Sequence, residues 1–119
     1  MLDLNIVINR DFIEATFTGI INRTNADDVI SKLSKVTIEN SINNWIMDVR
    51  NLDLQVGIAE AFFYIPKLSY AISKNIALVV NNEKKDFYSF FEVATNNRGM
   101  NIRHYDSVEK AKTWLNSIE

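Results

Sequence analysis

The 119-residue sequence contains no cysteine, one proline, three glycines and one histidine. Without cysteine the chain can form no disulfide, no thiolate metal site and no thiol nucleophile. The scarcity of proline and glycine leaves no segment with the composition of a linker, so we expect a single domain over residues 1–119. A formal net charge of −2 supplies no clustered positive charge for nucleic acid.

Long apolar segments are also absent, although apolar residues make up 47% of the chain. Spanning a bilayer takes ~20 consecutive apolar residues, and no segment approaches that length. The N-terminal sequence "MLDLNIVINRD" lacks the basic start and apolar core of a signal peptide. We therefore expect a cytoplasmic protein with no membrane span, and 119 residues suffice for one hydrophobic core.

Two short alternating segments open the chain. Residues 2–8 and residues 12–20 alternate apolar and polar side chains, which is typical of half-buried strands. The connection "NRD" between them is short, so the two strands should form an antiparallel hairpin.

The middle of the chain alternates helical and continuous apolar patterns. Residues 25–39 have helical spacing, with Asp27 and Asp28 in the first turn, where the helix dipole favours acids. "WIMDV" and "IALVV" are uninterrupted apolar runs, as expected of parallel strands buried on both faces. Between them, residues 57–73, "GIAEAFFYIPKLSYAIS", predict an apolar helix that Pro66 kinks or splits.

The last third repeats the pattern. Residues 84–98 predict an amphipathic helix with Phe87, Phe90 and Phe91 inward and Gly99 as its left-handed end. "MNIRHY" predicts a strand, and Asp106 predicts the start of a final helix. The element order is β-β-α-β-α-β-α-β-α. We expect an α/β fold with a mixed, mostly parallel sheet; the pattern leaves the strand order open.

This order and three segments resemble a known family. "WIMDVRNLD" and "SKNIALVVNNE" are similar to the central strands, and "FFEVATNNRGMNIRHYDSVEKAKTWL" to the closing segment, of STAS domains. The resemblance covers nearly the whole chain and points to the divergent STAS-like group often placed with CRAL-TRIO lipid-binding folds. It implies a bacterial regulatory or protein-interaction module similar to anti-sigma-factor antagonists. The matching closing residues are Arg98, Gly99, Asp106, Ala111, Trp114 and Leu115.

The resemblance fails at one place. Phospho-switched STAS antagonists accept phosphate on a serine after the central strand, in a motif similar to Asp-Ser-Ser-Gly. The corresponding residues here are 51–57, "NLDLQVG", which contain no serine or threonine. We therefore expect no phosphoacceptor serine in this segment.

The same segment offers weaker candidates for a binding surface. Asp53 and Gln55 either cap the following helix, whose turn Gly57 eases, or lie beside backbone N–H groups that bind an anion. Helices generally need such a start, and this favours the structural interpretation.

Catalytic patterns are missing from the sequence. His104 is the only histidine, and we interpret it as a half-buried structural residue, because a metal ligand or general base needs partners. No phosphate loop or nucleophile elbow is present. We expect no enzymatic activity, no metal site and no cofactor.

Aromatic residues form the strongest remaining signal. Phe62, Phe63, Tyr64 and Tyr70 crowd the kinked helix, and adjacent side chains on a helix point ~100° apart, so one sheet cannot bury them all. The surplus predicts one of three arrangements: packing between helices, a surface for a protein partner or a homodimer, or a cavity for a small hydrophobic ligand. The leading hypothesis is a protein-interaction module, and the alternative is a carrier or sensor of a lipid-like ligand.

Overall fold

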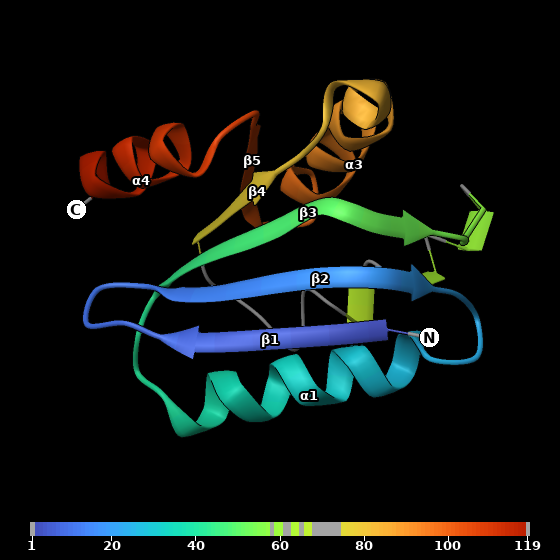
Figure 1. Ribbon diagram of the computed structural model, residues 1–119, viewed down its shortest axis with the longest axis horizontal. Coiled ribbons are helices and arrows are strands. Elements are labelled where there is room, and N and C mark those ends of the chain that lie inside the picture. The colour runs from blue at the N-terminus through green and yellow to red at the C-terminus, as the bar shows by residue number, and fades with distance from the viewer. Residues whose placement is uncertain (1, 58, 61–62, 65, 68–74, 119) are drawn as a thin grey trace.

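The computed structural model describes residues 2–57, 59–60, 63–64, 66–67 and 75–118 (Figure 1). Its elements are β1 (Leu2–Ile8), β2 (Ile13–Ile21), α1 (Ala26–Glu39), β3 (Asn44–Leu54), β4 (Asn75–Val79), the 3-10 turn η1 (Asn82–Lys84), α3 (Lys85–Asn96), β5 (Asn101–Tyr105) and α4 (Val108–Ser117). Between β3 and β4, the described residues from 59 to 67 are helical. The predicted alternation of elements is confirmed.

All five strands form one sheet in the order β1-β2-β3-β4-β5. The hairpin pairs β1 with β2 antiparallel, from Leu2 opposite Gly19 to Ile8 opposite Ile13. The three other pairs are parallel, so the expected mixed, mostly parallel sheet is confirmed. The order, which the sequence pattern left open, follows the chain.

Helices cover both faces of this sheet, with α1 on one side and α4 on the other (Figure 1). Ile46 and Val79 pack with Leu115 of α4 in the smaller core cluster. Their strand neighbours Trp45 and Leu78 belong to the larger cluster, with residues of α1 and α3. Because successive strand residues point to opposite faces, the continuous apolar runs are explained by burial on both faces.

Residues 51–57, the segment compared above with the phosphoacceptor motif, begin as a strand and not as a loop. β3 continues to Leu54, and its last four residues pair with residues 18–21 of β2. Leu52 is 5% exposed while Asp53 is exposed, so this part is a half-buried strand. The continuation of β2 supplies the hydrogen-bond partners, up to the bond from Gln55 N to Ile21 O at 2.7 Å.

Two details of the last third also differ from the sequence prediction. Phe90 is 44% exposed, and Tyr88, at 4%, is the buried aromatic residue of α3. The last helix is capped by Ser107, whose hydroxyl accepts a hydrogen bond from Lys110 N, and not by Asp106. Gly99 ends the α3 region with a φ of 86°, as predicted.

Candidate functional site

The carboxyl ends of β3 and β4 carry a group of interacting polar side chains. β4 pairs with β3 only as far as Asp48. Beyond that point, Asn81 Nδ2 donates to Arg50 O over 2.9 Å, and Lys84 Nζ donates to Leu52 O over 3.0 Å. These side chains bond backbone carbonyls of β3 that β4 does not reach. The group, here called the carboxyl-end cluster, comprises Asp48, Arg50, Asp53, Gln55, Asn81 and Lys84.

An ion pair anchors the cluster at β3. Arg50 Nη2 lies 2.7 Å from Asp48 Oδ2, and Arg50 Nε and N both donate to Oδ1, at 3.0 and 3.1 Å. Burial raises the pKa of the Asp48 carboxyl, but the hydrogen bonds from Arg50 and its positive charge outweigh burial and bring the pKa below its usual value. Asp48 is therefore a carboxylate already neutralised by its neighbour.

Asp53 and Gln55, both predicted as site residues, lie next to each other. Gln55 Nε2 donates to Asp53 Oδ2 over 2.8 Å, and Lys84 Nζ lies 3.8 Å from Asp53 Oδ1. The basic groups of the cluster thus each face a carboxylate. Open α/β sheets commonly bind ligands at this end, but the charge balance here favours a structural role for the cluster over anion binding.

Gly57 follows, exposed, and leads into the helical residues. Glu60 Oε2 there accepts a hydrogen bond from Arg23 Nε over 2.7 Å. The hydrogen bond from Arg23 lowers the pKa of Glu60. This contact joins the connection between β2 and α1 to the segment that follows β3.

Phe63 and Tyr64, which are adjacent in the chain, differ in burial. The Phe63 side chain is 62% exposed, while Tyr64 is half-buried and packs against the larger core cluster. Lys67 Nζ lies 4.6 Å from the Phe63 ring centroid and 3.0 Å from Asp27 Oδ1 of α1. The predicted site residues Phe62 and Tyr70 lie outside the described residues.

A groove runs between α1 and the helical residues around Pro66. It is lined by residues that include Ile30, Lys35 and Ile38 of α1, together with Pro66 and Lys67. Ile38 is 81% exposed, the highest value among the large apolar residues of the described chain. Below, "the Phe63 surface" means this groove together with Phe63.

A second hollow lies inside the larger core cluster. This cavity, of about 140 Å³, is lined by residues of all the strands except β1, by α1 and α3, and by Val56 and Tyr64. Its described lining carries no charged side chain, and the surface that faces the cavity is almost wholly apolar. A cavity was one of the three alternatives that the sequence pattern left open for the surplus of aromatic residues.

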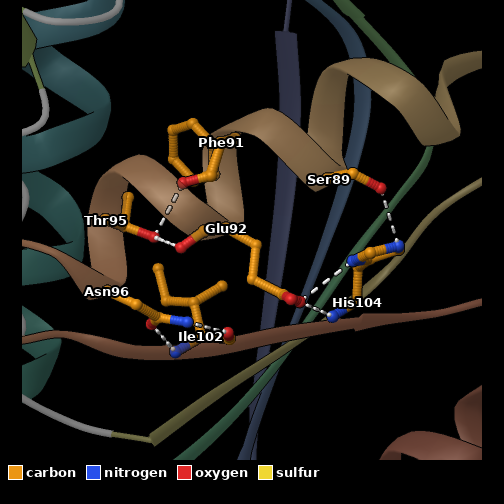
Figure 2. A network of polar contacts seen from close by, with 7 residues as sticks. All are labelled: Ser89, Phe91, Glu92, Thr95, Asn96, Ile102 and His104. Carbon is orange, nitrogen blue, oxygen red and sulfur yellow. Dashed lines mark hydrogen bonds and ion pairs between the residues drawn. The ribbon is translucent and has the colours of Figure 1, made fainter.

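A third polar arrangement joins α3 to the edge strand β5 (Figure 2). Glu92 Oε1 accepts hydrogen bonds from His104 N and lies 2.9 Å from His104 Nδ1. The Asn96 amide donates to Ile102 O and accepts from Ile102 N. Because the outer edge of a sheet presents unpaired backbone groups, these side chains take the place of a sixth strand.

His104 also contacts a hydroxyl, since its Nε2 lies 3.3 Å from Ser89 Oγ (Figure 2). A carboxylate that contacts an imidazole, which in turn contacts a hydroxyl, is the pattern of an activated serine nucleophile. Ser89, however, is the fifth residue of α3, so its N–H is used within the helix and is not free to form an oxyanion hole. The arrangement agrees with the interpretation of His104 as a half-buried structural residue.

Sequence reasoning missed the role of Arg50 and the partners of His104. A signal for the last existed: Ser89, Glu92 and Asn96 are spaced three and four residues apart, which predicts one polar stripe on a helix. The cavity beside Tyr88 has no signal in the sequence, because its walls come from six separate elements.

Solved structures with the same fold include anti-sigma factor antagonists. One from Mycobacterium paratuberculosis matches with a TM-score of 0.69 at 9% identity, over 98% of this chain and 95% of that chain. An uncharacterized protein of the DUF3478 family with a SpoIIAA-like fold, from Shewanella loihica PV-4, matches with a TM-score of 0.65 at 16% identity, over 96% of this chain and 93% of that chain. The anti-sigma factor antagonist SpoIIAA in its unphosphorylated form matches with a TM-score of 0.57 at 12% identity, over 99% of this chain and 100% of that chain.

The chain is thus an α/β protein with the SpoIIAA-like, or STAS-like, fold, and the fold that the sequence resemblance implied is confirmed. No family model and no curated protein matches the sequence. Within the described part of the chain, no helix combines the length and the apolar character that crossing a membrane requires.

Proposed function

We propose that this chain is a non-enzymatic regulatory module that acts by binding another protein molecule. The observation that carries the proposal is the match of the whole chain to an anti-sigma factor antagonist, a protein whose described role is to antagonise another protein. Residues 51–57 contain no serine or threonine, so the binding is not switched by a phosphoserine there.

The Phe63 surface is the contact region of this module. Ile38, which is 81% exposed, lines the groove, and Phe63, which is 62% exposed, contacts Lys67 of the same groove. Aromatic anchors beside concave surfaces dominate the binding energy of many protein interfaces. The cation of Lys67 above the Phe63 ring holds that ring in place for a partner.

The partner that this surface fits is a second copy of the chain. Its charges have both signs, with Lys35 and Glu39 along the groove and Lys67 at its side. A two-fold contact requires a surface complementary to itself, and alternating charges provide that complementarity. The interaction is therefore proposed as a homodimer.

Sedimentation velocity on a concentration series tests the proposal. Phe63→Glu places a carboxylate in the contact and should convert dimer to monomer, with an increase in Kd of at least tenfold. Val93→Glu is the matched control, because Val93 is 59% exposed on α3, outside the Phe63 surface. A wild-type protein that stays monomeric, or equal association of both variants, would contradict the proposal.

The cavity favours a second candidate function, the carriage or sensing of an apolar ligand. The cavity is about 140 Å³ in volume and carries no charged side chain in its described lining. Apolar clefts with few polar groups are the usual form of small-molecule sites.

A further inference from the structure

The two outer edges of the sheet differ in how the rest of the chain covers them. At β5, Glu92 and Asn96 of α3 hydrogen-bond the backbone of the strand. β1 forms the opposite edge and pairs on one side only, with β2 (Figure 1). Within the described residues, no other helix or strand hydrogen-bonds the backbone of β1. β1 is therefore the open edge of the sheet.

The hairpin shows which backbone groups of β1 point outward. Asn9 N donates to Phe12 O over 2.9 Å, so the backbone of Asn9 faces β2. β2 agrees with this assignment, because Ile21 O accepts from Gln55 N on the β3 side, and the even-numbered residues of β2 therefore face β1. Successive residues of an antiparallel ladder alternate between the two sides. The residues of β1 that present their N–H and C=O groups to the open side are thus Leu2, Leu4, Ile6 and Ile8.

β1 also lacks the usual protections of an exposed edge. Natural edge strands are very short, or carry lysine, proline or a bulge that prevents pairing with another chain. β1 has seven residues, "LDLNIVI", without lysine or proline, and it pairs with β2 without a register shift. Val7 is 47% exposed and Ile8 is 52% exposed. Such an edge is a template for one more strand.

The two faces of the hairpin define the chemistry of that added strand. On one face, half-buried apolar side chains of β1 pack against the larger core cluster: Leu2, Leu4 and Ile6. The other face carries Asp3 of β1 and Glu14 of β2, and neither strand contains lysine or arginine. The turn between the strands adds one charge of each sign, Arg10 and Asp11. Because neighbouring strands interact through side chains on the same face, the complementary strand alternates apolar and basic residues.

A second copy of β1 does not meet this requirement. Antiparallel pairing of two copies about Asn5 would place Asp3 of one copy opposite Val7 of the other. Val7 lies opposite Glu14 within the hairpin, so the carboxylates of Asp3 and Glu14 would be two strand spacings apart, about 10 Å. Neither strand supplies a cation to balance them. The charges therefore favour a foreign basic strand over a second copy.

We propose that the outer edge of β1 binds an extended segment of another protein, in which apolar and basic residues alternate, as a sixth strand of the sheet. Main-chain hydrogen bonds supply the affinity in this mode of recognition, and the alternating side chains supply the specificity. The site shares no residue with the Phe63 surface, so this inference goes beyond the proposed homodimer.

Amide hydrogen exchange, measured residue by residue by NMR on the full chain, tests the proposal. The probe is the peptide acetyl-Lys-Val-Lys-Val-Lys-Val-Lys-amide. In the free protein, the amides of Asn5 and Val7 should be protected by β2, whereas those of Leu4 and Ile6 should exchange rapidly. Saturation with the probe should slow exchange at Leu4 and Ile6 by about tenfold or more.

Two control peptides separate strand addition from attraction by charge. Acetyl-Lys-Lys-Pro-Pro-Pro-Lys-Lys-amide has the same length and charge, but its prolines lack the N–H groups that a strand needs. A peptide in which glutamate replaces every lysine of the probe keeps the apolar alternation and reverses the charge. Neither control should slow exchange at Leu4 or Ile6.

Two variants assign the effect to β1. Ile6→Pro removes an outward N–H at a place where edge strands tolerate proline, and it should weaken binding of the probe about tenfold, whereas Ile6→Val should not. Asp3→Lys should weaken binding of the probe and strengthen binding of the glutamate peptide. The same change at Asp86, exposed on α3, is the control and should do neither. Because Asp3 is exposed, its variant tests the proposal even if Ile6→Pro does not fold.

Four results would overturn the proposal. The probe fails to slow exchange at Leu4 and Ile6, or the triproline peptide slows it equally. Slow exchange at these amides in the free protein would show that the edge is already covered. Slowing that grows with protein concentration alone would show that a second copy occupies it. Phe63→Glu should leave binding of the probe unchanged, so failure of this proposal and failure of the homodimer are distinguishable.

Discussion

At the scale of single residues, two buried polar atoms stand apart from the rest of the core. Trp45 Nε1 and the Tyr88 hydroxyl have no hydrogen-bond partner among the described residues. Trp45 is fully buried, so its indole N–H reduces the stability of the fold by about 1–3 kcal/mol relative to a satisfied donor. Thr95, equally buried, instead donates to the Phe91 and Glu92 carbonyls.

Tyr88 should make stability depend on alkaline pH. Its pKa is raised by burial to about 12, while the unfolded chain releases the same proton near pH 10. The contribution of the neutral phenol is complete below pH 10 and is lost as pH rises toward 12. The free energy of unfolding of wild type should fall relative to Tyr88→Phe by about 1.4 kcal/mol per pH unit in that range.

Urea denaturation of both proteins at pH 9, 10 and 11 measures this difference. Parallel pH dependence of the two proteins would show that the Tyr88 hydroxyl is not buried as described.

Arg50 is predicted to stabilise the fold through Asp48. Arg50→Gln removes the ion pair from a carboxylate that is 12% exposed, and the cost should be about 1 kcal/mol, limited because Arg50 is 43% exposed and water screens the charges. The pKa of Asp48 is lowered, so this stability is present above pH 4 and is lost as pH falls further.

Thermal unfolding at pH 7 and pH 3 tests the effect of Arg50. Arg98→Gln is the control, because Arg98 is exposed beyond α3. An equal cost of Arg50→Gln at both pH values would contradict the role of the Asp48 charge.

At the scale of elements, the two edges of the sheet differ. β5 is bonded along its outer side by Glu92 and Asn96 of α3. β1, at the other edge, has a half-exposed surface, with Val7 47% and Ile8 52% exposed. A helix thus protects one edge against pairing with other chains.

Asn96→Ala should uncover the β5 edge. The change removes the donor and the acceptor that the amide offers to Ile102 and should lower the free energy of unfolding by about 1–2 kcal/mol. It should also accelerate amide hydrogen exchange at Ile102. Asn97→Ala is the matched control, one residue farther and exposed; equal effects of the two changes would show that edge protection lies elsewhere.

The elements also show how far the sequence could predict this molecule. The hairpin and the two-face strands were predictable because their side-chain period of two, or their continuous apolar character, is a local property. The second half of β3 could not be predicted in this way, because its polar residues are held in the sheet by pairing with β2. The capping of β5 by α3 and the cavity at Tyr88 depend on tertiary contacts, which a linear pattern does not contain.

At the scale of the whole molecule, the fold and the surface lead to the same proposal. The chain has the fold of anti-sigma factor antagonists across its length. In the described residues, the serine–histidine–glutamate arrangement is used at a sheet edge, and the carboxyl-end cluster is balanced in charge. The proposed binding function therefore rests on the Phe63 surface and, for the second candidate function, on the cavity.

Native mass spectrometry of freshly purified wild-type protein tests this account most directly. The account predicts a species of twice the 13.7 kDa chain mass, which Phe63→Glu reduces to the single chain and Val93→Glu leaves intact. A wild-type protein found only at the mass of one chain would contradict the central claim that the molecule acts through self-association at the Phe63 surface.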